Sequence, residues 1–242
     1  MSDIEDIQVR RIVSGRLEIT AGSVVGNHYP ANFDVLHLDE TQPVVVVVAD
    51  GMGGTEGSRV AGRTAVDVFA AHARPGPSAL RAAVAQAQRE VRAAGQGLGM
   101  LTGCTLTALV GDGSDAWLVQ IGDSRVYRLR DGFLDLLTVD HTAAWLGAVN
   151  GWYAFDSHEA HAARYRLSRY VGHPAMPEPD VLNVTLRPGD VYLLCTDGVA
   201  EQVPYQRIHD VLGTSDPVAR LLADSLAAGG QDNATAAVVR VR

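Results

Sequence analysis

The most apolar stretch of the chain is a run of five valines and one alanine at residues 44–49. A short, continuous apolar run is typical of a strand that is buried on both faces. The run ends abruptly at Asp50, and three of the next four residues are glycine. The pattern therefore predicts a central strand that delivers a carboxylate to the edge of a sheet.

Two helices are predicted directly after this strand. Residues 56–74 carry apolar side chains at a spacing of four, which marks one helical face: Ala61, Ala65, Phe69 and Ala73. The segment RPGP then breaks the chain, and Pro77 with Ser78 suits a helix start. The second helix has its apolar stripe at Leu80, Val84, Ala87, Val91 and Ala94. Two such helices in succession can lie antiparallel and cover a sheet.

Strand-like segments precede and follow the helix pair. Residues 17–38 contain LEITAGSVV and FDVLHL, joined by the turn-rich GNHYPAN. After the helices come CTLTALV, AWLVQI, RVYRL and FLDLLTV, which are separated by the short breaks GDGSD, GDS and RDG. Short breaks with Gly and Asp favour antiparallel hairpins, so we expect these four strands to form a meander.

The pattern changes to short helical and aromatic-rich pieces at residues 141–172 and then returns to strands in VLNVTL and VYLLC. Helical stretches follow at residues 205–212 and 216–228, and the last strand is ATAAVVRV. This order predicts an α+β fold in which two antiparallel sheets pack face to face with helices outside. Because we find no linker and no internal repeat, we expect residues 1–242 to form a single domain.

Composition narrows the classes of function. The chain has 242 residues, 47% of them hydrophobic and 20% charged, which is ordinary for a globular protein. Its net charge of −8 disfavours nucleic-acid binding, which needs a basic face. The N-terminus MSDIEDIQVRR lacks the order of a signal peptide, and no apolar run is long enough to cross a membrane. We therefore expect a cytoplasmic protein without a membrane span, with Cys104 and Cys195 as buried hydrophobic residues.

Several phosphate chemistries are excluded by residue identity. All 20 basic residues are arginine, which rules out a Walker A lysine, a kinase lysine and a Schiff base. A cysteine phosphatase needs Arg six positions after Cys, where this chain has Val110 and Glu201. There is no GxSxG motif and no GxGxxG motif, and His158 and His161 are one residue too close for HExxH.

Five aspartates stand at predicted strand ends, with glycine beside them or close by: Asp34, Asp50, Asp123, Asp197 and Asp232. Glycine lets backbone approach a ligand closely, although Asp-Gly alone is also an ordinary turn dipeptide. Strand ends of a sandwich gather at its rims, where clustered carboxylates repel one another unless a cation neutralises them. Oxygen ligands without His or Cys favour Mg²⁺ or Mn²⁺, and a pair of such ions can promote attack of hydroxide on phosphorus.

Five segments together resemble the metal-dependent serine/threonine protein phosphatases of the PPM family, or type 2C. They are VVADGMGG, TGCTLTALV, VQIGDSRVYRLRDG with LTVDHT after it, LLCTDG and GGQDNATAAVVRV, and the resemblance covers residues 19–241. It implies a four-layer α-β-β-α sandwich with two Mg²⁺ or Mn²⁺ ions at one rim. It also implies a flap subdomain at about residues 141–172, near the active site, which could contact the substrate.

The resemblance assigns roles to six residues. Asp50 would bridge both metal ions, the Gly51 carbonyl would bind one ion, and Asp197 and Asp232 would bind the other. Asp34 would bind through water or stand behind the ligands, and Asp123 with Asp197 would hold a looser third ion. A metal-bridging water would attack the phosphoryl group of a phosphorylated protein substrate, so no side-chain nucleophile is required. A serine/threonine kinase is the expected partner.

The chain departs from the family pattern in its early motif. Tyr29 replaces the Arg that usually grips the substrate phosphate, and Phe33 replaces a Glu that usually holds metal-bound water. Met52 occupies a position where some members have His. The departures predict weaker phosphate binding, which His28 or an N-terminal Arg could restore. They also leave a second hypothesis open, in which the chain is a regulatory or binding module with the phosphatase fold and little turnover.

Overall fold

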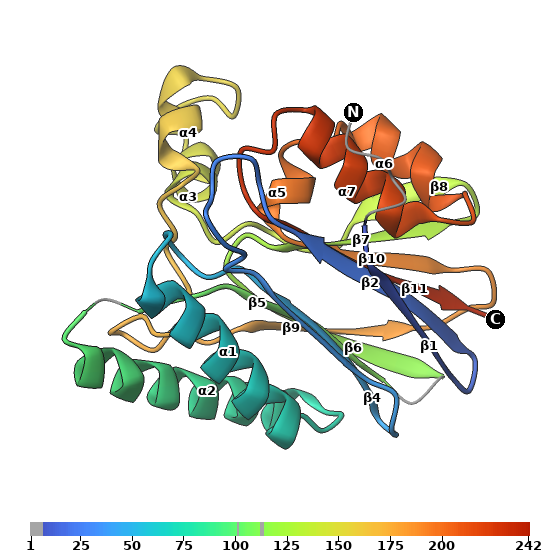
Figure 1. Cartoon of the computed structure of the whole chain (residues 1–242), viewed down its shortest axis with the longest axis horizontal. Helices are drawn as coiled ribbons and strands as arrows, with labels where there is room; N and C mark the ends of the chain where they lie inside the picture. Colours follow the sequence, from blue (N-terminus) through green and yellow to red (C-terminus); the bar gives the residue numbers. More distant parts are fainter. Residues whose placement is uncertain (1–6, 101, 112–113) are drawn as a thin grey trace.

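The structure is a computed structural model that describes residues 7–100, 102–111 and 114–242. Two antiparallel sheets of six and five strands pack face to face, and helices cover their outer faces (Figure 1). The predicted α-β-β-α sandwich is therefore confirmed. Two stretches named in the sequence analysis lie partly outside the described residues. They are the N-terminal segment MSDIEDIQVRR, at residues 1–6, and the GDGSD break, at residues 112–113.

The six-stranded sheet has the order β1-β2-β11-β10-β7-β8. Its strands are β1 (Val9–Ser14), β2 (Leu17–Val24), β11 (Ala234–Val241), β10 (Val191–Cys195), β7 (Arg125–Arg130) and β8 (Phe133–Leu136). Strand β1 was not predicted, because its sequence VRRIVS is mostly exposed and offers no continuous apolar face. It is an edge strand that β2 holds through backbone pairing.

The five-stranded sheet has the order β3-β4-β5-β6-β9. Its strands are β3 (Val35–Asp39), β4 (Val44–Ala49), β5 (Leu106–Gly111), β6 (Asp115–Ile121) and β9 (Asp180–Thr185). Every residue of β4 is buried, as the valine run predicts. Val45 and Val47 face the core beneath the helices, whereas Val46 and Val48 face the core between the sheets.

The predicted four-stranded meander is wrong. Strands β5 and β6 pair, and β7 and β8 pair, but β6 and β7 belong to different sheets. The GDS segment crosses from one sheet to the other, and Gly122 has a positive φ of 114° there. A short break with Gly and Asp marks a turn but does not specify whether the next strand returns to the same sheet. This crossing places Asp123 at a rim.

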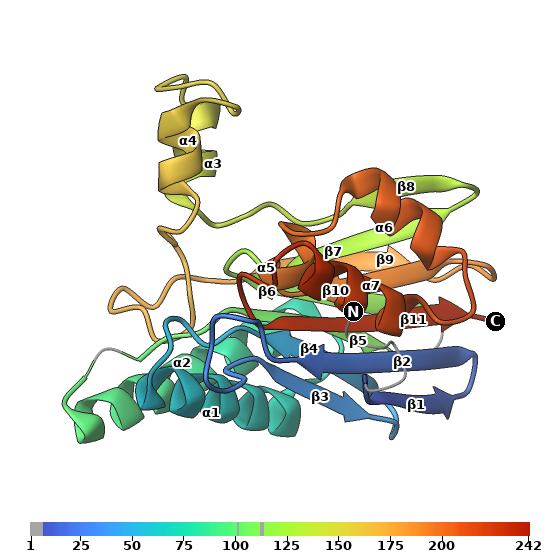
Figure 2. The same ribbon diagram turned by 45° about the horizontal axis from the view of Figure 1, so that its top comes forward.

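Helices α1 (Glu56–His72) and α2 (Pro77–Leu98) cover the five-stranded sheet, and the predicted stripe residues Phe69 and Leu80 are fully buried against it. Helices α5 (Asp197–Ala200), α6 (Tyr205–Leu212) and α7 (Pro217–Ala227) cover the other sheet. The short helices α3 (Ala143–Val149) and α4 (His158–Ala163) stand away from the sandwich (Figure 2). Within the described residues, no helix combines the length and apolar content needed to span a bilayer.

A buried ion pair fixes the start of β10. Both oxygens of Asp190 accept hydrogen bonds from Arg130, from Nε at 2.7 Å and from Nη2 at 2.6 Å. Arg130 also donates to the carbonyl of Thr185 in the opposite sheet at 2.9 Å. Burial by itself would raise the pKa of Asp190, but hydrogen bonds from Arg130 and the Arg187 backbone outweigh it and hold the pKa below 3.8. The ion pair therefore ties the two sheets together at the end of β10 remote from Asp197.

We expect Asp190→Asn to lower the free energy of unfolding by about 3 kcal/mol near neutral pH, because it leaves the Arg130 charge without its partner. The native pKa is depressed, so the carboxylate stabilises the fold above pH 3.8 and this contribution is lost as the pH falls through the native pKa. Urea titrations should therefore give stability curves for the two proteins that converge in acid.

The control is Asp135→Asn, which breaks the ion pair with Arg128 at 2.8 Å. The Asp135 side chain is 46% exposed, so the loss should stay below about 1 kcal/mol. Equal losses in the two variants would contradict a structural role for the Asp190 pair.

Candidate metal-binding site

The end of β4 holds Asp50 through its backbone. The Asp50 N–H donates to Thr105 Oγ1 at 2.9 Å, and the Asp50 carbonyl accepts from the Thr105 N–H at 2.9 Å. Thr105 Oγ1 also shares a hydrogen bond of 2.7 Å with Ser124 Oγ, directly after Asp123. One buried hydroxyl pair therefore couples the loop of Asp50 to the loop of Asp123.

Only glycine fits at position 51. A Cβ atom on Gly51 would lie 2.6 Å from the Ser58 carbonyl oxygen and 2.8 Å from the Phe33 carbonyl oxygen. Both are backbone atoms that cannot turn aside as a side chain could. The glycine after Asp50 therefore lets the start of α1 and the segment before β3 close around this turn.

Asp197 and Asp232 come from neighbouring strand ends, because Asp197 follows β10 and Asp232 precedes β11. The Thr235 N–H donates to Thr196 Oγ1 at 3.0 Å, and the Thr196 N–H donates to the Thr235 carbonyl at 3.1 Å. Asp232 Oδ1 accepts from the N–H of Asn233 at 2.7 Å. These bonds fix the two carboxylates side by side.

Asp34 stands behind this pair. Its Oδ2 accepts hydrogen bonds from the hydroxyls of Thr196 at 2.9 Å and Thr235 at 2.7 Å. Burial raises the pKa of Asp34 to about 7, although the two hydroxyl bonds act in the opposite direction. The residue therefore holds the segments that carry Asp197 and Asp232.

A pocket of about 200 Å³ brings together five of the six predicted metal-binding residues; Asp34 is the exception. It is lined by Tyr29, Phe33, Asp50, Gly51, Met52, Gly53, Asp123, Tyr165, Leu167, Asp197, Asp232 and Asn233. Residues far apart in sequence thus meet at one rim, as the strand-end pattern predicts.

The carboxylates destabilise one another's charged forms. Burial raises the pKa of Asp50, and the charge of Asp197 raises it further. Burial likewise raises the pKa of Asp197, followed by the charges of Asp123 and Asp232. Asp197 Oδ1 is buried and has no hydrogen-bond partner. A buried carboxylate oxygen without a partner is costly, and a cation would satisfy it.

The donor set fits a hard divalent cation, because the acids and the Gly51 carbonyl offer only oxygen. Within the described part of the chain, no three His, Cys, Asp or Glu side chains are gathered closely enough to hold an ion on their own. The carboxylates line a pocket rather than converge on a point. Backbone oxygen and water would have to complete any coordination shell.

The two replaced positions also lie at this pocket. The Tyr29 hydroxyl donates to Asp232 Oδ2 at 3.5 Å, and its ring meets that of Phe33 edge to face at a centroid distance of 6.1 Å. Among the residues lining the pocket there is no Arg, Lys or His. His28 is exposed and does not line it, and the Arg11 guanidinium pairs with Glu18.

Sequence reasoning did not find the residues that support the site. Thr105, Thr196 and Thr235 stand beside the motif acids or pair with them, and their hydroxyls carry the hydrogen bonds described above. Their signal was a Thr at the end of an apolar strand. Tyr165 and Leu167 enter the pocket from the segment after α4, within residues 141–172, which the resemblance put near the active site without singling out these two residues.

His141 was not predicted to support the site either. Its Nδ1 accepts from the Gly122 N–H at 3.1 Å, and its Nε2 donates to Asp180 Oδ2 at 3.0 Å. Burial lowers the pKa of His141, and its neutral form matches this pattern of one acceptor and one donor. The ring therefore fixes the turn that presents Asp123.

Comparisons of the sequence with a family profile and with known proteins identify the same family. The sequence profile of Protein phosphatase 2C matches residues 32–240. The serine/threonine protein phosphatase PstP of Mycobacterium tuberculosis is 33% identical over 217 residues, which are 81% of this chain and 40% of that protein. The chain therefore spans less than half the length of this relative.

Solved structures agree. The crystal structure of the Mycobacterium tuberculosis serine/threonine phosphatase PstP/Ppp superposes with a TM-score of 0.83 at 32% identity, covering 93% of this chain and 99% of that one. The catalytic domain of PstP in complex with 2 manganese ions gives a TM-score of 0.81 at 32% identity, covering 93% and 98% of the two chains.

We expect Gly51→Ala to lower the free energy of unfolding by about 1–3 kcal/mol, because its Cβ overlaps two carbonyl oxygens. The same overlap should displace Asp50 and weaken Mn²⁺ binding in a calorimetric titration. The control is Gly97→Ala in α2, where a Cβ meets nothing within 4 Å. That change should stabilise the protein by about 0.5–1 kcal/mol and leave Mn²⁺ binding unaltered. Identical behaviour of the two variants would refute the steric argument.

Proposed function

The chain belongs to the protein phosphatase 2C family, and we propose from this that it is a metal-dependent phosphoserine/phosphothreonine protein phosphatase. The observation that carries the proposal is the pocket in which Asp50, Asp123, Asp197 and Asp232 meet. Their raised pKa values and the partnerless Oδ1 of Asp197 call for bound cations. The similar PstP domain with its manganese ions supports the same reading.

In this proposal the pocket holds two Mg²⁺ or Mn²⁺ ions. Asp50, the Gly51 carbonyl, Asp197 and Asp232 would hold these ions, and Asp34 would support Asp197 and Asp232 through its hydrogen bonds with Thr196 and Thr235. Asp123, which lines the same pocket, would hold a third ion together with Asp197. Ions bound in this way lower the pKa of water and neutralise charge that develops on phosphoryl oxygens.

We propose solvent water as the nucleophile. The residues lining the pocket include no Ser, Cys or His, and its aspartates are the proposed metal ligands. Both cysteines are buried, and burial raises the pKa of Cys195 to about 12 and that of Cys104 further, so neither supplies a thiolate. Hydrolysis by water, with the carboxylates as supports, is the mechanism that these residues allow.

Phosphate recognition depends on neutral donors. Tyr29 and Tyr165 carry the hydroxyls that line the pocket, and no guanidinium does so. A charged hydrogen bond contributes about 1.5–3 kcal/mol, and a neutral one contributes less. We therefore propose an enzyme with weaker phosphate binding than relatives that have an Arg at this position.

The finer expectations remain parts of the proposal. They are a phosphorylated protein as substrate, a serine/threonine kinase as partner, a cytoplasmic location, and one domain with a flap at about residues 141–172. The alternative function is a regulatory or binding module. The replacements Tyr29 and Phe33, together with a pocket that no cationic side chain lines, favour this second candidate.

We expect the purified protein to hydrolyse p-nitrophenyl phosphate and a phosphothreonine peptide when Mn²⁺ is present. Chelation with EDTA or the change Asp50→Ala should abolish this activity. Chelation removes the metal ions, and the substitution removes a carboxylate that would hold them. Calorimetry with Mn²⁺ measures binding separately from turnover. Metal binding without turnover on a panel of phosphopeptides would support the module and reject the enzyme.

We expect Tyr29→Arg to lower the KM for a phosphothreonine peptide about tenfold, since a guanidinium adds a charged hydrogen bond to the phosphate. The matched change Tyr29→Phe keeps the ring against Phe33 but removes the hydroxyl, and it should raise KM. Steady-state kinetics at saturating Mn²⁺ checks both. Unchanged KM values in both variants would contradict a role of this position in phosphate binding.

A further inference from the structure

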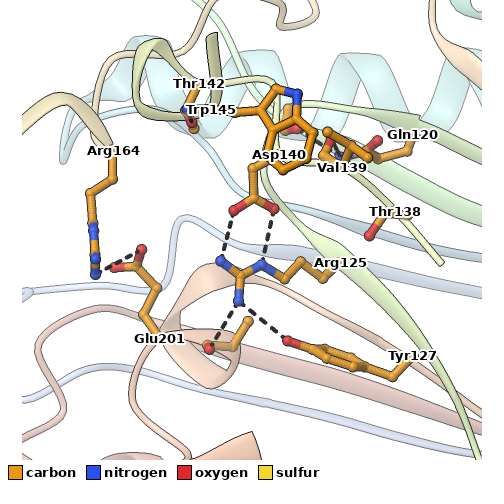
Figure 3. A network of polar contacts seen from close by, with 12 residues as sticks. Gln120, Arg125, Tyr127, Thr138, Val139, Asp140, Thr142, Trp145, Arg164 and Glu201 are labelled. Carbon is orange, nitrogen blue, oxygen red and sulfur yellow. Dashed lines mark hydrogen bonds and ion pairs between the residues drawn. The ribbon is translucent and has the colours of Figure 1, made fainter. Parts of the chain in front are cut away.

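A second pocket of about 320 Å³ lies beside the metal-binding pocket. Arg125 at the start of β7, Asp140 after β8 and Glu201 after α5 form its inner wall. The outer wall comes from the segment of α3 and α4, with Trp145, Phe155 and Arg164. Figure 3 shows the polar side chains of this region pointing toward one another beneath Trp145.

The two pockets are joined by neighbouring residues. Arg125 and Asp123 are two positions apart, so their Cα atoms lie at most about 7 Å from each other. Glu201 follows Asp197 by one turn of α5, or about 6 Å. Arg164 directly precedes Tyr165. A peptide adds about 3.3–3.6 Å per residue, so a phosphorylated residue in the first pocket places a near neighbour at the second.

In the second pocket, the carboxylate of Asp140 already has a cationic partner for both of its oxygens. Asp140 accepts from Arg125 Nε at 2.9 Å and from Arg125 Nη2 at 2.7 Å. The remaining nitrogen of Arg125 donates to the Tyr127 hydroxyl and to the Ala200 carbonyl, both at 3.3 Å. This guanidinium and this carboxylate therefore form a fixed wall.

The other carboxylate is held loosely. Glu201 pairs with Arg164 at 3.5 Å, and the two side chains are 19% and 34% exposed (Figure 3). Arg164 also contacts Nδ1 of His161 at 2.9 Å. The pair is partly exposed, and its single contact of 3.5 Å is longer than the Arg125–Asp140 contacts, so an incoming cation can replace Arg164 at Glu201.

Two aromatic rings stand over this carboxylate wall. The Trp145 and Phe155 rings lie 5.5 Å apart at 52°, and these residues are 36% and 61% exposed. Aromatic faces beside a carboxylate attract an ammonium or guanidinium group. The chemistry of the pocket is thus that of a receptor for a cationic side chain.

We propose that this pocket binds an Arg or Lys side chain of the phosphoprotein substrate, close in sequence to the phosphorylated residue, at Glu201 and the rings of Trp145 and Phe155. The bound cation displaces Arg164 from Glu201. The proposal rests on the phosphatase function proposed above. It specifies a basic residue near the phosphorylated residue as the sequence feature that the enzyme prefers.

An acidic group on Arg164 is the competing occupant. It would lie next to Glu201 and Asp140, and the Asp140 charge is the one already matched by Arg125. The charge of Glu201 would be left unpaired at the same time. A cation at Glu201, by contrast, leaves Arg164 its contact with His161 Nδ1 at 2.9 Å, and the two rings attract a cation but not an anion. The arrangement therefore favours a cation, and the acidic alternative becomes an outcome of the test.

The test compares phosphothreonine peptides with a single Arg, Ala or Glu at each position from about four residues before to four after the phosphothreonine. The readout is the ratio of kcat/KM for the Arg peptide to that for the Ala peptide on the same enzyme. We expect a ratio of about tenfold at one position, the size of a cation–π contact combined with an ion pair. A ratio on one enzyme cancels losses common to both peptides.

Two variants of the same ion pair should change this ratio in opposite directions. Glu201→Gln removes the receptor and should reduce the ratio to below about twofold. Arg164→Gln removes the competing internal cation and should raise the ratio. Trp145→Leu should lower it through loss of the aromatic face. The control is Glu159→Gln, an exposed acid of α4 that does not line the pocket, and it should leave the ratio unchanged.

Failure of this inference and failure of the proposed function have different signatures. Without Mn²⁺-dependent hydrolysis of p-nitrophenyl phosphate, the phosphatase function is wrong and the subsite falls with it. If p-nitrophenyl phosphate is hydrolysed but no Arg peptide is preferred, the subsite alone is overturned. A preference for Glu peptides that Arg164→Gln abolishes, or an Arg preference that survives Glu201→Gln, also overturns it.

Discussion

The mutual repulsion of carboxylates at one rim of the sandwich is the constraint on which the rest of the structure depends. Asp50, Asp123, Asp197 and Asp232 line one pocket, and burial raises the pKa of each. Neighbouring negative charges raise it further at Asp50, Asp123 and Asp197. Carboxylates held this closely are stable only when protonated or when a cation lies among them. A rigid scaffold is needed to hold them together, and the two sheets with their covering helices provide it. The same repulsion is what makes the pocket suited to divalent ions.

Threonine hydroxyl groups, and the close packing of backbone around Gly51, hold the acids in place on this scaffold. Thr105 links the loops of Asp50 and Asp123, and Thr196 with Thr235 links the strand ends near Asp197 to Asp34. These hydroxyls are buried and satisfied by hydrogen bonds, so moving any one of them exposes another polar group. The chain thus positions the acids at the rim through hydrogen bonds from uncharged hydroxyl donors.

The segment with α3 and α4 gives the site its outer side. It contributes Tyr165 and Leu167 to the metal-binding pocket and Trp145, Phe155 and Arg164 to the neighbouring one. Several of its aromatic residues are exposed, among them Trp152, Phe155 and Tyr165. In the proposed phosphatase, where no guanidinium lines the first pocket, recognition of a substrate would depend more on what surrounds the phosphate. Contacts made by this segment are therefore the natural source of specificity.

The sequence by itself determined the two sheets, the helix pairs and the identity of the acids, because each follows from local periodicity or from a residue type at a strand end. The valine run could only be a strand covered on both faces, and Asp50 had to follow it. Only the tertiary structure decided which strands share a sheet. Strands β6 and β7 separate at Gly122 although their connecting turn is typical of a hairpin, because pairing depends on the packing of both sheets and not on three residues. For the same reason the threonines that hold Asp34, and the pocket around Glu201, became visible only when residues distant in sequence were brought together.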